Sequence, residues 1–167
     1  MMPTTTHDGP LSIHREKVQK DWIDYNGHLN MAYYLLVFDH ATDAFFDYVG
    51  LGEDYSRKTD GTTFTLEGHI SYIREVKEND ILRFETFVLD FDAKRIHYAH
   101  AMYEDSENYM AATNELMTLH VSQSERRACK IPATALTQLK TLKNAHIGLI
   151  KPPGLSRTIG LNQKRAN

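Results

Sequence analysis

Between Met31 and Val49 the apolar residues recur at the spacing of a helix. An α-helix turns once in about 3.6 residues, so residues three or four apart share a face. Two adjacent apolar stripes run along this segment, which predicts a long and mostly buried helix. Asn30 is a favourable N-cap residue, and Gly50 with Gly52 is expected to end the helix. The stripes consist of Met31, Tyr34, Leu35, Phe38, Ala41, Phe45 and Val49, and of Tyr33, Val37, Ala44 and Tyr48.

After residue 60 the pattern changes to an alternation of apolar and polar positions, which is typical of strands with one buried face. Turn-forming residues divide this region into four long strands. Because the strands follow one another closely, the simplest topology is an antiparallel meander of neighbours. The four expected strands are 62–77, 81–91, 95–103 and 109–122, and a shorter one is expected within 11–20.

One long helix against one curved antiparallel sheet is a two-layer α+β fold. A short helix is expected at 132–145, with Pro132 at its start. We expect residues 1–146 to form one domain and residues 147–167 to form a basic C-terminal tail. The sheet would keep an uncovered face and free edges, and both favour association. We therefore expect a homodimer, with a dimer of dimers as the larger alternative.

The net charge of −3 conceals a strong asymmetry along the chain. Residues 126–167 contain nine Lys or Arg and no acid, and every Asp and Glu lies at or before Glu125. This pattern fits a solvated tail that offsets an acidic body, and it equally fits a surface for a phosphate-bearing partner. Nucleic acid is disfavoured because the whole chain is acidic and no stacking-aromatic motif accompanies the basic residues.

Apolar runs and cysteine content narrow the class further. The longest apolar run, 31–38, is too short to cross a bilayer, and the N-terminus has no secretory signal pattern. We therefore expect a cytoplasmic protein without a membrane partner. Cys129 is the single cysteine, which excludes an internal disulfide and a multi-cysteine metal site. No zinc-ligand spacing or phosphate-binding glycine loop is present, so neither a metal nor a cofactor is expected.

The segment 21–30, Asp-Trp-Ile-Asp-Tyr-Asn-Gly-His-Leu-Asn, holds most of the candidate chemistry. It leads into the long helix, whose first N–H groups are unpaired and carry a partial positive charge. A carboxylate beside such donors is what acyl transfer needs, and Asp24 is the best candidate because it lies near the flexible Gly27. The alternative is that Asp, Asn and Gly stand here because they favour turns, with His28 as a structural hydrogen-bonding residue.

The motif D-x-x-G-H-x-N at 24–30, followed by Met-Ala-Tyr-Tyr, resembles the 4-hydroxybenzoyl-CoA-type thioesterases of the hot-dog fold. The segment 67–76, Glu-Gly-His-Ile-Ser-Tyr-Ile-Arg-Glu-Val, and the following Asn-Asp-Ile-Leu at 79–82 are also similar to that family. The resemblance covers about residues 11–131. It implies a hot-dog fold, in which a curved sheet wraps around a long central helix, and hydrolysis of an acyl-CoA thioester without a cofactor.

The resemblance also implies roles for individual residues. Asp24 matches the catalytic carboxylate, and the backbone N–H of Met31 falls where the family polarises the thioester carbonyl. Asn30 and His28 match positions that shape the loop. Glu67 matches a frequent strand acid of uncertain role, for which a structural salt bridge is an equal alternative.

A further set of residues is similar to the thioesterases of bacterial carnitine breakdown, which are assigned to betainyl-CoA. These residues are Thr113-Asn114-Glu115-Leu116-Met117, His120-Val121 and Arg126-Arg127. Betaine carries a trimethylammonium group, which proteins bind with aromatic faces and nearby carboxylates. The aromatic candidates are Trp22, which is favoured as the single tryptophan two residues before Asp24, and Tyr25, Tyr33 and Tyr34, with Asp39 and Asp43 as the acids. The alternative is that Tyr34 packs in the core, Tyr33 lines a dimer contact and the acids face water.

The sequence leaves open the role of Arg126 and Arg127 and the choice among related functions. Arg126 and Arg127 are candidates for binding the phosphates of CoA, or they only solubilise the end of a strand. The alternatives to a betainyl-CoA thioesterase are a non-catalytic acyl-CoA-binding sensor on the same fold and a thioesterase for another short or aromatic acyl group.

Overall fold

The structure is a computed structural model that describes residues 9–161 of the 167-residue chain. Its elements are, in order, β1 (Leu11–Lys17), the 3-10 turn η1 (Lys20–Trp22), α1 (Met31–Val49), α2 (Glu53–Lys58), β2 (Gly61–Tyr72), β3 (Ile81–Phe91), β4 (Arg95–Glu104), β5 (Tyr109–Ser122), β6 (Arg127–Ala128) and α3 (Ala133–Ala145).

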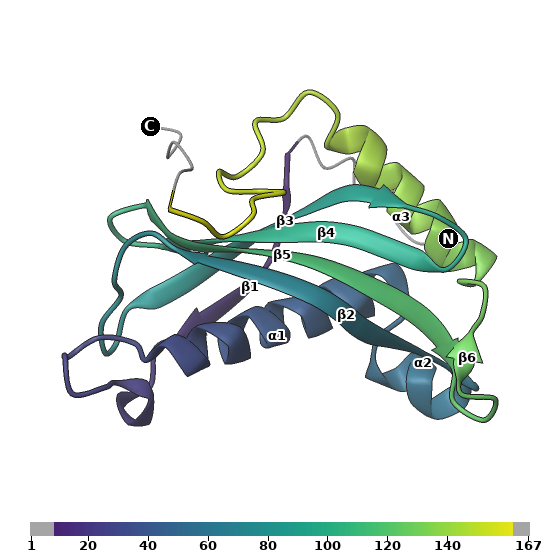
Figure 1. Cartoon of the computed structure of the whole chain (residues 1–167), viewed down its shortest axis with the longest axis horizontal. Coiled ribbons are helices and arrows are strands. Elements are labelled where there is room, and N and C mark those ends of the chain that lie inside the picture. Colours follow the sequence, from purple (N-terminus) through teal and green to yellow (C-terminus); the bar gives the residue numbers. More distant parts are fainter. Residues whose placement is uncertain (1–8, 162–167) are drawn as a thin grey trace.

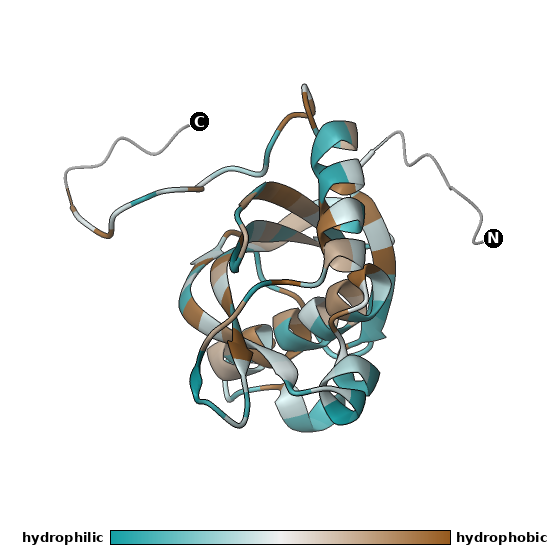
Figure 2. Ribbon diagram, turned by 90° about the vertical axis from the view of Figure 1, so that its right-hand side faces the viewer, coloured by the Kyte–Doolittle hydropathy of each residue, from teal (hydrophilic) through white to brown (hydrophobic). Residues whose placement is uncertain are grey.

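The strands form one antiparallel sheet in the order β1-β3-β4-β5-β2, with the short β6 paired to β5. The sheet curves around α1, which lies along its concave face (Figure 1). This arrangement confirms the expected α+β class and the hot-dog fold. Brown and teal patches alternate along the strands in Figure 2, as a period-two pattern with one buried face predicts.

The predicted meander is wrong at β2, which pairs with β5 at the sheet edge and not with β3. The connection from Tyr72 to Ile81 is too long for a tight turn, and it crosses the end of the sheet. The N–H groups of Ile73 and Arg74 both donate to the Ala111 carbonyl, which ends β2 before the predicted residue 77. The place beside β3 is taken by β1.

The bounds predicted for the long helix are confirmed at both ends. The Asn30 side chain accepts a hydrogen bond from the Ala32 N–H at 3.0 Å, and Gly50 ends the helix with a left-handed φ of 82°. One core cluster packs around the N-terminal half of α1 and contains Phe38 and Phe84. A second cluster packs around its C-terminal half and contains Phe45 and Leu139 of α3.

The helix α3 covers the part of β3 that β1 leaves without a partner. The His146 Nδ1 atom accepts a hydrogen bond from the Val88 N–H at 3.0 Å, which takes the place of a strand partner. The short helix expected at 132–145 is therefore confirmed, with its first helical residue at Ala133. The elements α2 and β6 had no counterpart in the sequence prediction.

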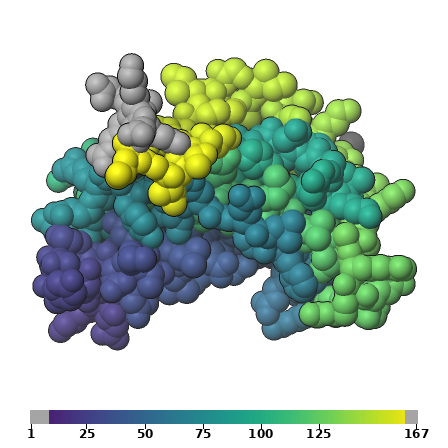
Figure 3. All heavy atoms as spheres, in the orientation of Figure 1, coloured from purple at the N-terminus to yellow at the C-terminus, as the bar shows by residue number. Residues whose placement is uncertain are grey.

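The chain after α3 lies across the outer face of the sheet, opposite α1. The Thr113 hydroxyl donates to the Pro153 carbonyl at 3.4 Å, and the Ser156 N–H donates to the Glu115 carboxylate at 2.5 Å. In Figure 3 the yellow atoms of this segment rest on the strands. The division after residue 146 stays a prediction, and residues 1–8 and 162–167 of its two parts lie outside the described range.

Candidate active site

The loop that precedes α1 is a tight turn held by its own main chain. The Asp24 N–H donates to the His28 carbonyl at 3.0 Å, and the Gly27 N–H donates to the Asp24 carbonyl at 3.0 Å. Gly27 has a φ of 85°, which a residue with a side chain adopts only with strain. Ile23 and Leu29 form a bridge across the base of this turn. The turn therefore places Asp24 immediately before the helix N-terminus.

The first turn of α1 keeps one donor available. Asn30 binds the N–H of Ala32, and within residues 9–161 the N–H of Met31 has no hydrogen-bond partner. This N–H belongs to the positive end of the helix dipole. Asp24 and Met31 line one pocket of about 290 Å³. The other lining residues are Leu29, Tyr34, Tyr72, Ile73, Arg74 and Glu75.

The Asp24 carboxylate is partly used by the turn itself. Its Oδ1 atom accepts a hydrogen bond from the Asn26 N–H at 2.8 Å, as in an Asx turn. Its Oδ2 atom has no partner among the described residues. Asp24 is half-buried, so the carboxylate is held in place and reaches the pocket. A fixed carboxylate with one free oxygen can serve as a base or as a nucleophile.

The remaining candidates, from the loop and from the first turn of α1, do not line this pocket. The His28 Nε2 atom lies 2.9 Å from the Glu75 carboxylate, which fixes the loop against the connection after β2. Trp22 and Tyr33 stack on each other with ring centroids 5.7 Å apart. Tyr25 is 97% exposed at the tip of the turn.

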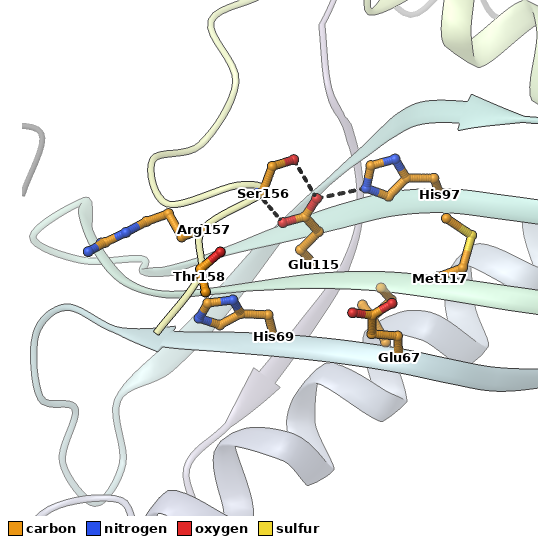
Figure 4. Close-up of a pocket in the computed structure, with 9 residues that line it drawn as sticks. Glu67, His69, His97, Glu115, Met117, Ser156, Arg157 and Thr158 are labelled. Carbon is orange, nitrogen blue, oxygen red and sulfur yellow. Dashed lines mark hydrogen bonds and ion pairs between the residues drawn. The ribbon is translucent and has the colours of Figure 1, made fainter. Parts of the chain in front are cut away.

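Glu67 lies in a different pocket, on the outer face of the sheet (Figure 4). This pocket of about 330 Å³ is roofed by the C-terminal segment. Inside it the Glu115 carboxylate accepts hydrogen bonds from Ser156 and lies 2.7 Å from the His97 Nε2 atom. Within one chain the sheet therefore separates Glu67 from Asp24.

Arg126 and Arg127 lie at β6, at the opposite end of the molecule from the 21–30 loop (Figure 1). Arg127 pairs with Glu125 at 2.6 Å, and the Arg126 guanidinium lies 5.9 Å from the ring centroid of Phe64. Both side chains are exposed. One chain alone does not bring these arginines to the Asp24 pocket.

Sequence reasoning did not propose Tyr72 or Glu75 as site residues. They come from the end of β2 and from the connection after it, 48 and 51 positions beyond Asp24 in the sequence. The Leu29 N–H donates to the Val76 carbonyl at 2.9 Å, and this contact brings the connection beside the loop. No local sequence pattern predicts such a long-range contact. A correct strand order would have been needed to find these residues.

Two classes of site are not found in the described part of the chain. No group of three or more His, Cys, Asp or Glu side chains in residues 9–161 could hold a metal ion. None of the helices in that range is long and apolar enough to span a membrane.

Comparison with known proteins identifies the family. The model of the thioesterase-like superfamily matches residues 18–139. A betainyl-CoA thioesterase of Pseudomonas aeruginosa is 38% identical over 151 residues, which are 90% of this chain and 95% of that protein. The solved structure of a putative thioesterase from Pseudomonas putida is 36% identical with a TM-score of 0.80, and covers 98% of this chain and 100% of its own.

A Staphylococcus aureus protein solved in complex with CoA is also similar. It has a TM-score of 0.84 and 26% identity, and the match covers 91% of this chain and 96% of that one. The match to the family model, residues 18–139, spans the 21–30 loop, α1 and the strands from β2 to β5. It therefore includes every element that builds the Asp24 pocket. The chain therefore belongs to the thioesterase-like superfamily.

Proposed function

We propose that this protein is an acyl-CoA thioesterase that hydrolyses a small acyl-CoA to the free acid and CoA. The observation that carries the proposal is that the Asp24 carboxylate and the unpaired Met31 N–H line the same pocket. A thioester carbonyl needs a donor for the charge that develops on its oxygen, and a carboxylate that attacks it or activates water. Family membership supports the same reaction.

In this mechanism the carbonyl oxygen accepts a hydrogen bond from the Met31 N–H, and the helix dipole stabilises the negative charge. On one route Asp24 attacks the carbonyl carbon, CoA leaves as the thiolate, and water hydrolyses the resulting anhydride. On the other route Asp24 takes a proton from a water molecule that attacks directly. Both routes yield the acid and CoA.

The two routes differ in where the new oxygen atom comes from. A single turnover in oxygen-18 water gives an unlabelled first product if Asp24 attacks and water then adds to the Asp24 carboxyl carbon of the anhydride, because the Asp24 oxygen stays with the product. The first product is labelled at once if water attacks directly. An unlabelled first product therefore establishes attack by Asp24, whereas a labelled one arises from direct attack of water or from water adding to the acyl carbon of the anhydride. The thioesterase proposal holds with either.

We propose that two copies pair through β2. Within residues 9–161, β2 bonds to β5 along one side and is open along the other. The open side is apolar as well as unpaired, since Phe64 is 45% and Leu66 is 56% exposed, and Leu35 of α1 is 56% exposed. A long, apolar and unpaired edge is expected to be covered by another strand. The β2 edge of a second copy has the same properties and can pair with it.

This pairing would complete the site. The exposed stretch of β2, residues 64–68, is centred on Leu66, so antiparallel pairing about that residue sets Tyr72 of one copy opposite Asp60 of the other. Asp60 binds the N–H of Ser124 at 2.9 Å, in the turn that carries Arg126. The basic turn of one copy would then border the Asp24 pocket of the other.

We therefore propose that Arg126 and Arg127 of a second copy bind the phosphates of CoA. Within one chain these arginines lie far from Asp24, and pairing of two copies through β2 would bring them to the Asp24 pocket of the other copy. The similarity to a Staphylococcus aureus protein solved with CoA supports a CoA ester as the ligand. The cytoplasmic location stays a prediction from the sequence.

For the acyl group we propose betaine, since the Pseudomonas aeruginosa relative is named a betainyl-CoA thioesterase. A thiol-release assay over a panel of short, aromatic and cationic acyl-CoA compounds tests both the reaction and the substrate. We expect release of CoA thiol, fastest from betainyl-CoA. Tight binding of these compounds, measured by calorimetry, without any thiol release would instead identify a non-catalytic sensor.

A further inference from the structure

Two tyrosine rings form one wall of the Asp24 pocket. Tyr34 on the first turn of α1 and Tyr72 at the end of β2 meet edge to face, with ring centroids 5.1 Å apart and planes at 87°. Burial raises the pKa of Tyr34 to about 12, and burial also raises the pKa of Tyr72. Both phenols therefore stay neutral at neutral pH, and together they present an electron-rich corner to the pocket.

Carboxylates border this corner, while the nearest guanidinium is engaged elsewhere. Asp24 and Glu75 both line the pocket. Arg74 also lines it, but its guanidinium lies 3.7 Å from the ring centroid of Tyr109 and 3.3 Å from the carboxylate of Glu107. Glu75 is itself paired with His28 at 2.9 Å, so the pocket lining holds two carboxylates and one guanidinium, a net formal charge of −1.

The short distance between the cation and the carbonyl of a betainyl group places the cation in this pocket. Its quaternary nitrogen is one methylene away from the thioester carbonyl carbon, at about 2.5 Å. A carbonyl bound to the Met31 N–H therefore holds the trimethylammonium beside the first turn of α1. Asp39 and Asp43 follow Met31 by eight and twelve residues, which is about 12 and 18 Å along a helix. They are too far along α1 to touch the cation.

The other aromatic candidates do not face the bound acyl group. Trp22 and Tyr33 use their ring faces against each other, and Tyr25 is 97% exposed. None of these three lines the pocket that contains Asp24. The corner formed by Tyr34 and Tyr72 is thus the aromatic surface within reach of the carbonyl.

We propose that Tyr34, Tyr72 and Glu75 form a subsite that selects acyl groups with a quaternary ammonium next to the thioester carbonyl. Such a cation has no hydrogen-bond donor, so aromatic faces and a carboxylate are the groups that distinguish it from a neutral isostere. This inference rests on the proposed thioesterase function and assigns its specificity to particular side chains. Tyr72 and Glu75 act on binding, while Asp24 and Met31 act on the carbonyl.

The test compares kcat/KM for betainyl-CoA with kcat/KM for 3,3-dimethylbutyryl-CoA, which has the same shape and no charge. We expect the wild-type protein to prefer the cationic ester. Tyr72→Leu should lower that preference roughly 5- to 30-fold, while Tyr72→Phe, which keeps the ring, should preserve it. Glu75→Gln should lower it as well, and more strongly at low salt.

The neutral ester is the internal control, because its hydrolysis needs the fold and the catalytic groups but not the subsite. Glu78→Gln is the matched carboxylate control and should keep the preference, since Glu78 is exposed and lies three residues beyond Glu75, outside the pocket. A preference that Tyr72→Leu and Glu75→Gln leave unchanged would overturn the subsite while the thioesterase stands. Equal constants for both esters in the wild type would overturn it too. No hydrolysis of any acyl-CoA would overturn the proposed function itself.

Discussion

The His100 Nε2 atom on β4 lies 3.0 Å from the Thr42 hydroxyl on α1, in the middle of the core. Its Nδ1 atom lies 2.9 Å from the Thr86 hydroxyl on β3. His100 has no exposed surface, and burial, with a smaller contribution from His14, lowers its pKa to about 3. A neutral imidazole therefore ties the central helix to two strands between the two core clusters.

This buried histidine predicts an acid-dependent loss of stability. In the unfolded chain His100 has an ordinary pKa of about 6.5, so below that pH the unfolded state binds a proton that the folded state excludes. The contribution is present above pH about 6.5 and is lost as the pH falls toward about 3. His100→Gln should reduce the slope of unfolding free energy against pH by up to about 1.4 kcal/mol per unit. Denaturant titrations between pH 4.5 and 7.5 measure both slopes, and identical slopes would contradict the account.

The sequence predicted the elements better than their connections. The bounds of α1 followed from its two apolar stripes, Asn30 and Gly50, which all act locally. The partner of β2 depends on how residues 73–80 cross the sheet end, which no local pattern encodes. The helix α2 did have a local signal, in the pairs Glu53–Arg57 and Asp54–Lys58 at a spacing of four residues.

The sequence predicted the site residues that belong to a local motif, but not those that depend on the strand order. Asp24 and Met31 share a local motif with the helix start, and the structure brings them to one pocket. Tyr72 and Glu75 reach that pocket only through the strand order. The C-terminal segment had no period to indicate that it lies on the sheet, because its contacts are scattered, such as the buried Pro152 and the hydrogen bond between Ser156 and Glu115.

The hydrogen bond from Ser156 to Glu115 predicts how the C-terminal segment is anchored to the sheet. Burial raises the pKa of Glu115, but the Ser156 N–H and His97 outweigh it, so the pKa is lowered overall. The anchoring is thus present above pH about 4.5 and is lost as the pH falls below it. Glu115→Gln should speed amide hydrogen exchange at Ser156 roughly tenfold. Glu67→Gln, in the same pocket, is the control, and equal exchange in both variants would contradict the anchoring role.

The open edge of β2 predicts an interface. Leu66→Lys places a charge in the middle of the proposed pairing and should weaken association at least about a hundredfold. Sedimentation at several concentrations measures this change. Ile13→Lys is the matched control, since Ile13 is 43% exposed on β1 at the other edge. A Leu66→Lys protein that associates like the wild type would exclude pairing through β2.

The basic turn predicts a contribution to CoA binding. Reversing Arg126 and Arg127 to Glu should raise KM for CoA esters roughly 5- to 10-fold, with a smaller change in kcat. The effect should shrink with added salt, because exposed charges are screened. Lys140→Glu with Lys143→Glu makes the same charge change on α3 and should leave KM unaltered. An unchanged KM at low salt in the first variant would locate the CoA phosphates elsewhere.

The most direct test of the account is the turnover of Asp24→Asn in the thiol-release assay. Asparagine keeps the acceptor for the Asn26 N–H, so the turn should stay intact while the charge and basicity are lost. We predict a fall in kcat of at least about a hundredfold, with CoA binding and thermal stability retained. Asp21→Asn, three residues earlier and exposed, should keep full turnover. An Asp24→Asn protein that turns over within a few-fold of the wild type would remove this carboxylate from the mechanism.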